Sequence, residues 1–203
     1  MYSKARLHFK KNDPILHKAS LEFEIEDLKE SDDVFRDIVW TIIGQQLSGK
    51  AADTIFGRFI ALFPGRELEP RRILKLSDSA MRACGLSGAK ARAIKSFAEH
   101  MITGRIDLDR LPTLSDAEVL AELTKVKGIG PWTAEMILMF SLGRADIFSA
   151  GDLGLRKGLM HLYGLKKAPS DSRIAALTSR WSPYRTYGAR ILWRIADKKK
   201  ARL

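Results

Sequence analysis

Apolar residues recur at helical spacing along most of the chain. Ser31 is predicted as an N-cap, with Asp32 and Asp33 in the first turn, where the helix dipole favours negative charge. The apolar side chains that follow have the i, i+3, i+4, i+7, i+8 spacing of a helix facing a core: Phe35, Ile38, Val39, Ile42 and Ile43. The same pattern predicts helices over residues 51–63, 71–75, 79–84, 90–102, 115–126, 132–142, 153–163, 172–180 and 184–196.

The first thirty or so residues show no comparable stripe, so we expect the first strong helix to begin near Ser31. Strand-like alternation occurs only over residues 21–26, and this segment is brief and has no evident partner strand. Short connections carrying Gly or Pro separate the predicted helices. The pattern therefore predicts an all-α fold, with two helical lobes that share the long helices.

Two of these helices form a hairpin over residues 115–142. Ser115 and Glu118 have the spacing of a capping box. The first helix is expected to end at Gly128, and Pro131 suits the first turn of the second because it has no N–H to lose there. A Gly-Ile-Gly turn permits positive φ and a close approach, so its N–H groups could bind an anion such as a DNA phosphate. A simple packing corner with a glycine C-cap explains the spacing equally well.

The charge balance favours a polyanionic partner. The 203 residues include 35 Lys and Arg against 24 Asp and Glu, a net charge of +11. Such an excess promotes nucleic-acid binding through counterion release. Charge alone does not settle the partner, because many basic proteins bind nothing specific.

Cysteine, histidine and hydropathy exclude several classes of protein. The single cysteine, Cys84, excludes an internal disulfide and a cluster held by four thiolates of one chain. The four histidines are too scattered to indicate zinc. No secretory signal or membrane-spanning apolar run is present, so we expect a protein without membrane association in the cytoplasm or nucleoid.

Four segments carry a family resemblance. They are IGQQLS at residues 43–48, KGIGPWTA at 127–134, DIFSAGD at 146–152, and WSPYRTY at 181–187 continuing to Trp193. Together they resemble the helix-hairpin-helix DNA glycosylase superfamily, in particular its 3-methyladenine DNA glycosylase II branch, over about residues 33–196. The resemblance implies one helix-hairpin-helix domain over residues 1–203, with two helical subdomains and an active-site cleft between them.

The resemblance implies that Asp152 is the catalytic carboxylate. From position alone Asp152 is an N-cap, and the two roles are compatible because a helix N-terminus favours the carboxylate anion. Cleavage of a base from deoxyribose passes through a transition state resembling an oxocarbenium ion, which a carboxylate near the sugar stabilises. A purine alkylated at N3 or N7 is already cationic, so it leaves without a strong general acid.

The resemblance also implies a base pocket and a single activity. Bifunctional relatives carry a Schiff-base lysine where this chain has Trp132, so we expect a monofunctional enzyme that leaves an abasic site. The pocket is expected to contain Trp132, Trp193, Tyr187 and Met136, of which Met136 replaces a tyrosine of a bacterial relative. Aromatic faces suit a flipped, cationic base. Trp193 also lies off the apolar stripe of its helix, although a helix covered on both faces would explain that position too.

DNA contacts are expected from the hairpin and from a turn earlier in the chain. In the hairpin they are Gly128, Ile129, Gly130 and Thr133, and in the turn they are Gln45, Gln46, Leu47 and Ser48. The turn matches the family's wedge, and Gln46 or Leu47 would fill the space left by the flipped base. Without the family, Gly44 simply ends one helix and Ser48 caps the next.

The resemblance implies Na⁺ or K⁺ at the hairpin, held by backbone carbonyls of Thr124, Val126 and Ile129, and no other cofactor. The leading hypothesis is a monomeric hydrolase that flips and excises N-alkylated purines, chiefly 3-methyladenine, from double-stranded DNA. One alternative is a non-catalytic helix-hairpin-helix DNA-binding module, which would need neither Asp152 nor Trp193. Another is the same chemistry on uracil, mismatched thymine or an oxidised purine.

Overall fold

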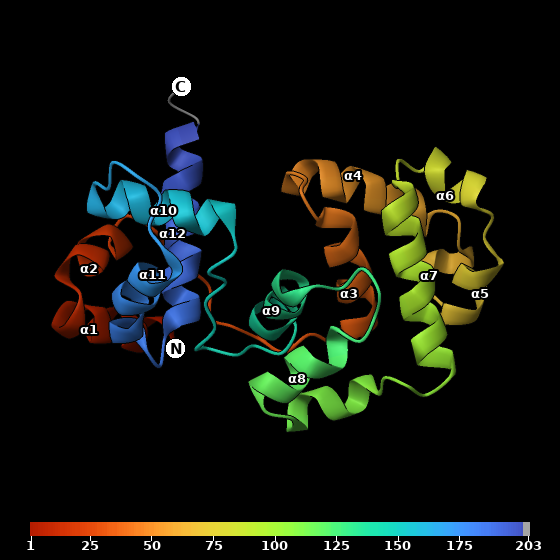
Figure 1. Ribbon diagram of the computed structural model, residues 1–203, viewed down its shortest axis with the longest axis horizontal. Coiled ribbons are helices and arrows are strands. Elements are labelled where there is room, and N and C mark those ends of the chain that lie inside the picture. The colour runs from red at the N-terminus through yellow and green to blue at the C-terminus, as the bar shows by residue number, and fades with distance from the viewer. Residues whose placement is uncertain (201–203) are drawn as a thin grey trace. The chain divides into compact units, whose positions relative to one another are not determined.

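The computed structural model describes the backbone of residues 1–200 and the side chains of residues 1–198 (Figure 1). Within this range the chain is helical, with no strand, which confirms the predicted all-α class. The chain divides into two compact units, one contiguous over residues 31–142 and one that joins residues 1–30 to the segment beginning at residue 143. None of the helices in the described residues has the length and hydropathy of a membrane span.

The contiguous unit is organised around a central helix, α3 (Val34–Gly44), which packs against α4 (Gly49–Ile60), α7 (Gly88–Ile102) and α9 (Pro131–Phe140). The short helices α5 (Pro70–Lys75) and α6 (Asp78–Ala83) pack on α7, and α8 (Asp116–Leu123) packs on α9. Two 3₁₀ turns, η1 (Pro64–Arg66) and η2 (Leu108–Thr113), complete the unit. Its two ends meet where Ser31 N–H donates to the Ser141 carbonyl at 2.8 Å.

The predicted stripe of α3 is the core of this unit. Ile38, Val39, Ile42 and Ile43 are fully buried, and each contributes roughly 1.5–3 kcal/mol through burial. Phe35 stacks on Phe97 of α7 with ring centroids 5.1 Å apart. The predicted N-cap was wrong by two residues: Asp33 caps α3 by accepting from the Arg36 N–H at 2.9 Å.

The second unit contains two N-terminal helices that the sequence analysis did not predict, α1 (Tyr2–Asn12) and α2 (Pro14–Ser20). It also contains α10 (Leu153–Tyr163), α11 (Asp171–Thr178), η3 (Ser179–Trp181) and α12 (Arg185–Lys200), with α10 packed across α12. Residues 21–26, whose alternation was strand-like, form no strand.

A buried aspartate joins the N-terminal helices to the rest of this unit. Asp13 is 1% exposed and caps α2 by accepting from Leu16 N–H. Its other oxygen accepts from the Trp181 indole N–H at 2.8 Å and from the Tyr163 hydroxyl. Burial, followed by the nearby Asp13 carboxylate, raises the pKa of Tyr163, so the phenol remains a neutral donor.

Helices α10 and α12 approach each other closely because a glycine faces their contact. A Cβ built on Gly158 would lie 2.6 Å from the Leu192 carbonyl oxygen and 2.7 Å from Leu192 Cβ. Any larger residue would force the two helices apart. This contact fixes the separation of the two helices that carry Asp152 and Trp193.

Candidate functional site

The hairpin is built by α8, a seven-residue turn over residues 124–130, and α9. Ser115 and Glu118 form the predicted capping box at the start of α8. The helix ends at Leu123 with Thr124 as its C-cap, earlier than the predicted end at Gly128. Pro131 occupies the first position of α9, as predicted, and Gly130 is the N-cap. The start of α9 is therefore a helix N-terminus suited to an anion.

The two glycines of the turn have different physical roles. Gly128 has φ +98°, and a Cβ there would collide with Ala93 Cβ of α7, so the fold itself requires glycine. Gly130 has φ −98°, which any residue adopts, and a Cβ there would meet nothing within 4 Å. Neither the backbone conformation nor internal packing explains the glycine at position 130. A group outside the protein that approaches the backbone closely would explain it.

The turn between α3 and α4 has its own hydrogen bonds to the hairpin. The Gln45 side-chain amide donates to the Gly128 carbonyl and to Thr133 Oγ1, both at 3.0 Å. Thr133 is buried and its hydroxyl accepts from Gln45, and the DNA contact expected of this residue stays a prediction. Gln46 and Leu47 are exposed at the tip of the turn. Ser48 caps α4.

One of the carbonyls expected to hold a monovalent cation already has a partner, because Val126 O accepts from the Ile129 N–H at 3.0 Å. No group of three or more His, Cys, Asp or Glu side chains suited to a metal occurs among residues 1–200. The proposed cation site rests on backbone carbonyls and stays a prediction.

In the other unit, Asp152 and Trp193 meet through a hydrogen bond. Asp152 is the N-cap of α10, and its Oδ1 accepts from the Leu155 N–H at 2.7 Å. The same oxygen accepts from the Trp193 indole N–H at 3.0 Å. Trp193 lies off the buried stripe of α12, as predicted, and is half-buried against α10. The two residues predicted for the site from distant parts of the sequence are therefore brought together.

A glycine packs directly against this pair. A Cβ built on Gly154 would lie 3.0 Å from Asp152 Oδ1 and 3.0 Å from Trp193 Cδ1. Real Cβ atoms are rarely so close to their neighbours, so an alanine here would move the carboxylate or the indole by a few tenths of an ångström. Gly154 therefore helps to set the geometry of the Asp152–Trp193 pair.

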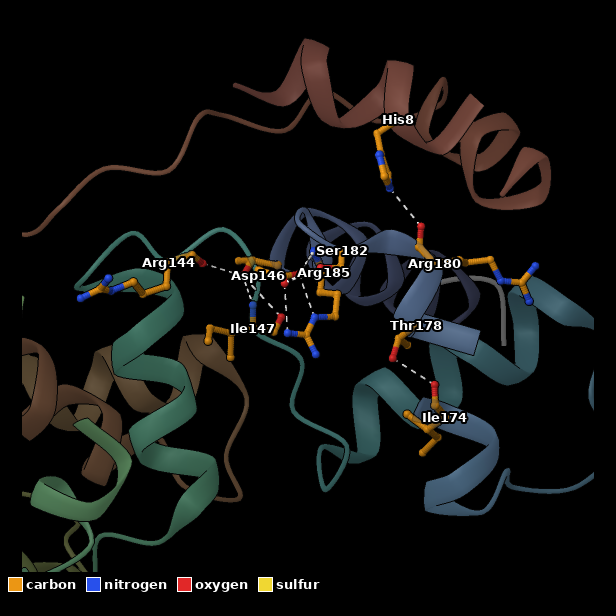
Figure 2. A network of polar contacts seen from close by, with 10 residues as sticks. His8, Arg144, Asp146, Ile147, Ile174, Thr178, Arg180, Ser182 and Arg185 are labelled. Atoms are coloured by element: carbon orange, nitrogen blue, oxygen red, sulfur yellow. Dashed lines mark hydrogen bonds and ion pairs between the residues drawn. The ribbon is translucent and has the colours of Figure 1, made fainter. Parts of the chain in front are cut away.

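The loop that leads to Asp152 is anchored at both ends. At its start, Asp146 accepts from the Arg185 side chain at 2.8 Å and from the Ser182 hydroxyl at 2.7 Å, and Thr186 Oγ1 accepts from the Ile147 N–H (Figure 2). Burial alone would raise the pKa of Asp146. The hydrogen bonds from Arg185 and Ser182 outweigh it and hold the pKa below its ordinary value.

At the end of the loop, Arg156 of α10 donates to the Ala150 carbonyl at 2.8 Å and the Pro169 carbonyl at 3.0 Å, and pairs with Asp171. Sequence reasoning missed this residue. The available signal was a cation in the first turns of a helix, where the dipole disfavours positive charge and compensating contacts are needed.

The residues predicted to line a base pocket lie in different environments. Trp132 is half-buried on α9, and Met136, one turn later, is buried. Tyr187 lies in the core of its own unit, stacked on Tyr2 at 5.8 Å, and its hydroxyl accepts from the Leu28 N–H. Its side chain has no exposed surface and packs within the core of this unit, and the base contact expected of Tyr187 stays a prediction.

The α8–α9 hairpin defines a helix-hairpin-helix protein, and the Asp152 carboxylate held beside the Trp193 indole is a group that could take part in a reaction. The family model for HhH-GPD superfamily base excision DNA repair proteins matches residues 39–183. The chain therefore belongs to the HhH-GPD superfamily.

Two curated relatives come from yeasts. DNA-3-methyladenine glycosylase 1 of Schizosaccharomyces pombe is 37% identical over 176 residues, 84% of this chain and 77% of the relative. DNA-3-methyladenine glycosylase of Saccharomyces cerevisiae is 32% identical, over 82% of this chain and 68% of the relative.

Two solved structures of DNA glycosylases are also similar to this chain. The 3-methyladenine DNA glycosylase of Schizosaccharomyces pombe in complex with abasic DNA has a TM-score of 0.86 and 34% identity, over 94% of this chain and 95% of that one. A DNA-3-methyladenine glycosidase from Bacillus halodurans has a TM-score of 0.79 and 35% identity, over 96% and 89% of the two chains.

Proposed function

We propose that this protein is a monomeric, monofunctional DNA glycosylase that excises N-alkylated purines, 3-methyladenine among them, and leaves an abasic site in double-stranded DNA. The observation that carries the proposal is the hydrogen bond from Trp193 to Asp152, which presents an indole beside a held carboxylate. The names of the relatives support the substrate class.

The chemistry follows from a carboxylate whose orientation is held by hydrogen bonds. Leu155 N–H and the Trp193 indole both bond to Oδ1 of Asp152. Such a carboxylate stabilises the positive charge that develops on the sugar as the glycosidic bond breaks, and it can orient the attacking water. The electron pair of the broken bond goes to the base, which is cationic beforehand and leaves neutral. A water oxygen then bonds to C1′ and loses its proton.

The hairpin would hold the DNA backbone. The start of α9 and the absence of a Cβ at Gly130 suit a phosphate that approaches the chain closely. The net charge of +11 supports the same assignment. Na⁺ or K⁺ bound by carbonyls of the turn would add positive charge there.

The direct test is an excision assay on duplexes that each contain one defined lesion. We expect release of 3-methyladenine and 7-methylguanine, with an intact strand until alkali cleaves the abasic site. Lesions such as uracil and 8-oxoguanine in parallel duplexes test the other substrate classes. A protein that binds DNA but releases no base would be a binding module. The strand is expected to stay intact because Trp132 cannot form a Schiff base. Strand cleavage without alkali would therefore contradict a monofunctional enzyme.

Gly154→Ala is expected to lower single-turnover excision about tenfold, since misplacing a catalytic group by a fraction of an ångström has effects of this order or larger. Affinity for an abasic duplex should change little. Gly151→Ala is the matched control, because a Cβ at Gly151 meets nothing within 4 Å. Equal activity of the two variants would show that Gly154 does not position the Asp152–Trp193 pair.

A further inference from the structure

The turn between α3 and α4 has an uncommon backbone at its tip. Gln46 has φ +59°, in the left-handed region that residues with a Cβ seldom adopt. Such a conformation persists only where surrounding contacts maintain it. The exposed side chains of Gln46 and Leu47 stand at this tip, so whatever holds the backbone also sets where they project.

One anchor of the turn is a lysine from a different helix. Lys90, in the first turn of α7, donates from Nζ to the Ile43 carbonyl and to the Gln45 carbonyl, each at 2.8 Å. These carbonyls lie at the C-terminal end of α3, where backbone acceptors lack helical partners and a cation is favoured. Lys90 is partly buried, and its ammonium satisfies both acceptors.

The second anchor is the side chain of Gln45, which donates to the Gly128 carbonyl and Thr133 Oγ1 of the hairpin. The residue before Gln46 is therefore held on both sides, by Lys90 through its backbone and by the hairpin through its side chain. This short chain of contacts therefore connects the tip to the hairpin.

We propose that Lys90 is a positioning residue for base flipping, which holds the Gln46–Leu47 tip in the conformation that enters the duplex while the Gln45 contacts tie that tip to the phosphate-binding hairpin. The inference rests on the proposed function. It extends that function by assigning the rigidity of the tip to a side chain that touches neither base nor sugar.

The test compares Lys90→Met with the wild type on duplexes with one 7-methylguanine, placed either opposite cytosine or in a mispair. Methionine retains most of the apolar stem and removes the ammonium. Two carbonyls would lose a charged donor, so we expect excision opposite cytosine to fall about tenfold or more. In the mispair the loss should be clearly smaller, because less energy is needed to extrude the base. Affinity for an abasic duplex should stay within about twofold, since no pair must be opened there.

The matched control is Lys95→Met on the same helix, which removes the ion pair with Asp78 and leaves the turn untouched. It should behave as wild type. If Lys90→Met reduces excision equally on both duplexes, or weakens abasic binding in parallel, the lysine only stabilises the fold and the proposal is overturned. Unchanged excision on both duplexes overturns it as well.

Gln45→Met provides a second route should Lys90→Met fold poorly. It removes the hydrogen bonds from Gln45 to the hairpin while Lys90 remains in place. We again expect excision to fall more opposite cytosine than in the mispair. Fluorescence of a 2-aminopurine beside the lesion reports unstacking without requiring chemistry. A wild-type protein that unstacks the probe but excises nothing would refute the proposed function while leaving this inference open to the fluorescence comparison. Equal unstacking by wild type and both variants would refute the inference alone.

Discussion

Asp152→Asn is expected to reduce excision of an alkylated purine by at least about a hundredfold, the scale seen when a charge-stabilising group is removed from a transition state. The substitution is nearly isosteric. An asparagine Oδ1 can still accept from Leu155 N–H and the Trp193 indole, so α10 keeps its cap and the indole keeps its partner. What is lost is the negative charge. Single-turnover kinetics on a 7-methylguanine duplex measure the effect.

Binding of the same variant to an abasic duplex separates chemistry from structure. Affinity close to that of wild type, with an unchanged Tm, would place the loss in the chemical step. The control is Asp197→Asn, which removes one exposed carboxylate from α12 and should retain full activity. Loss of abasic binding by Asp152→Asn would instead identify the residue as a structural cap, and unimpaired excision would remove Asp152 from the mechanism.

The second large effect is expected at the hairpin. Gly128→Ala combines a positive φ with a collision against Ala93, so a loss of roughly 2–4 kcal/mol in the free energy of unfolding is expected. Because the hairpin turn is displaced, DNA binding should fall too. Denaturant unfolding and a binding titration on an abasic duplex provide the two measurements.

Gly130→Ala is the informative counterpart. The site has an ordinary φ and open space, so stability should change by no more than about 0.5 kcal/mol. If a phosphate occupies that space, DNA affinity should fall despite the intact fold, and the loss should be greatest at low salt. Full affinity in Gly130→Ala would mean that no DNA group approaches the backbone there.

Patterns that depend on neighbours in sequence could be predicted well. The stripe of α3, the Ser115–Glu118 capping box and Pro131 at the start of α9 all follow from local spacing, and the structure contains each of them. Trp193 was predicted from the family resemblance, and its place off the buried stripe of its helix was consistent with that prediction. The juxtaposition of Asp152 and Trp193 is not local, and its expectation depended on the family resemblance.

The features that the sequence did not reveal depend on tertiary contacts. The acceptors of Lys90 lie more than forty residues away in sequence, and nothing in its own helix distinguishes it. The stacking of Tyr187 on Tyr2 could not be predicted either, because Tyr2 lies in a helix that the sequence pattern did not indicate. For α2, the other helix that was not predicted, the Asp13-Pro14 pair was an available signal, because an N-cap is followed there by proline at the first helical position.

The discontinuous unit has a consequence for biosynthesis. Its first thirty residues leave the ribosome early, yet the indole and phenol that bond to Asp13 belong to residues 181 and 163. Residues 31–142 are contiguous, and the bond between Ser31 and Ser141 joins their ends, so this unit can fold while the later segment is still being translated. The carboxylate–indole pair needs Trp193, so a nascent chain can form its hairpin before its Asp152–Trp193 pair.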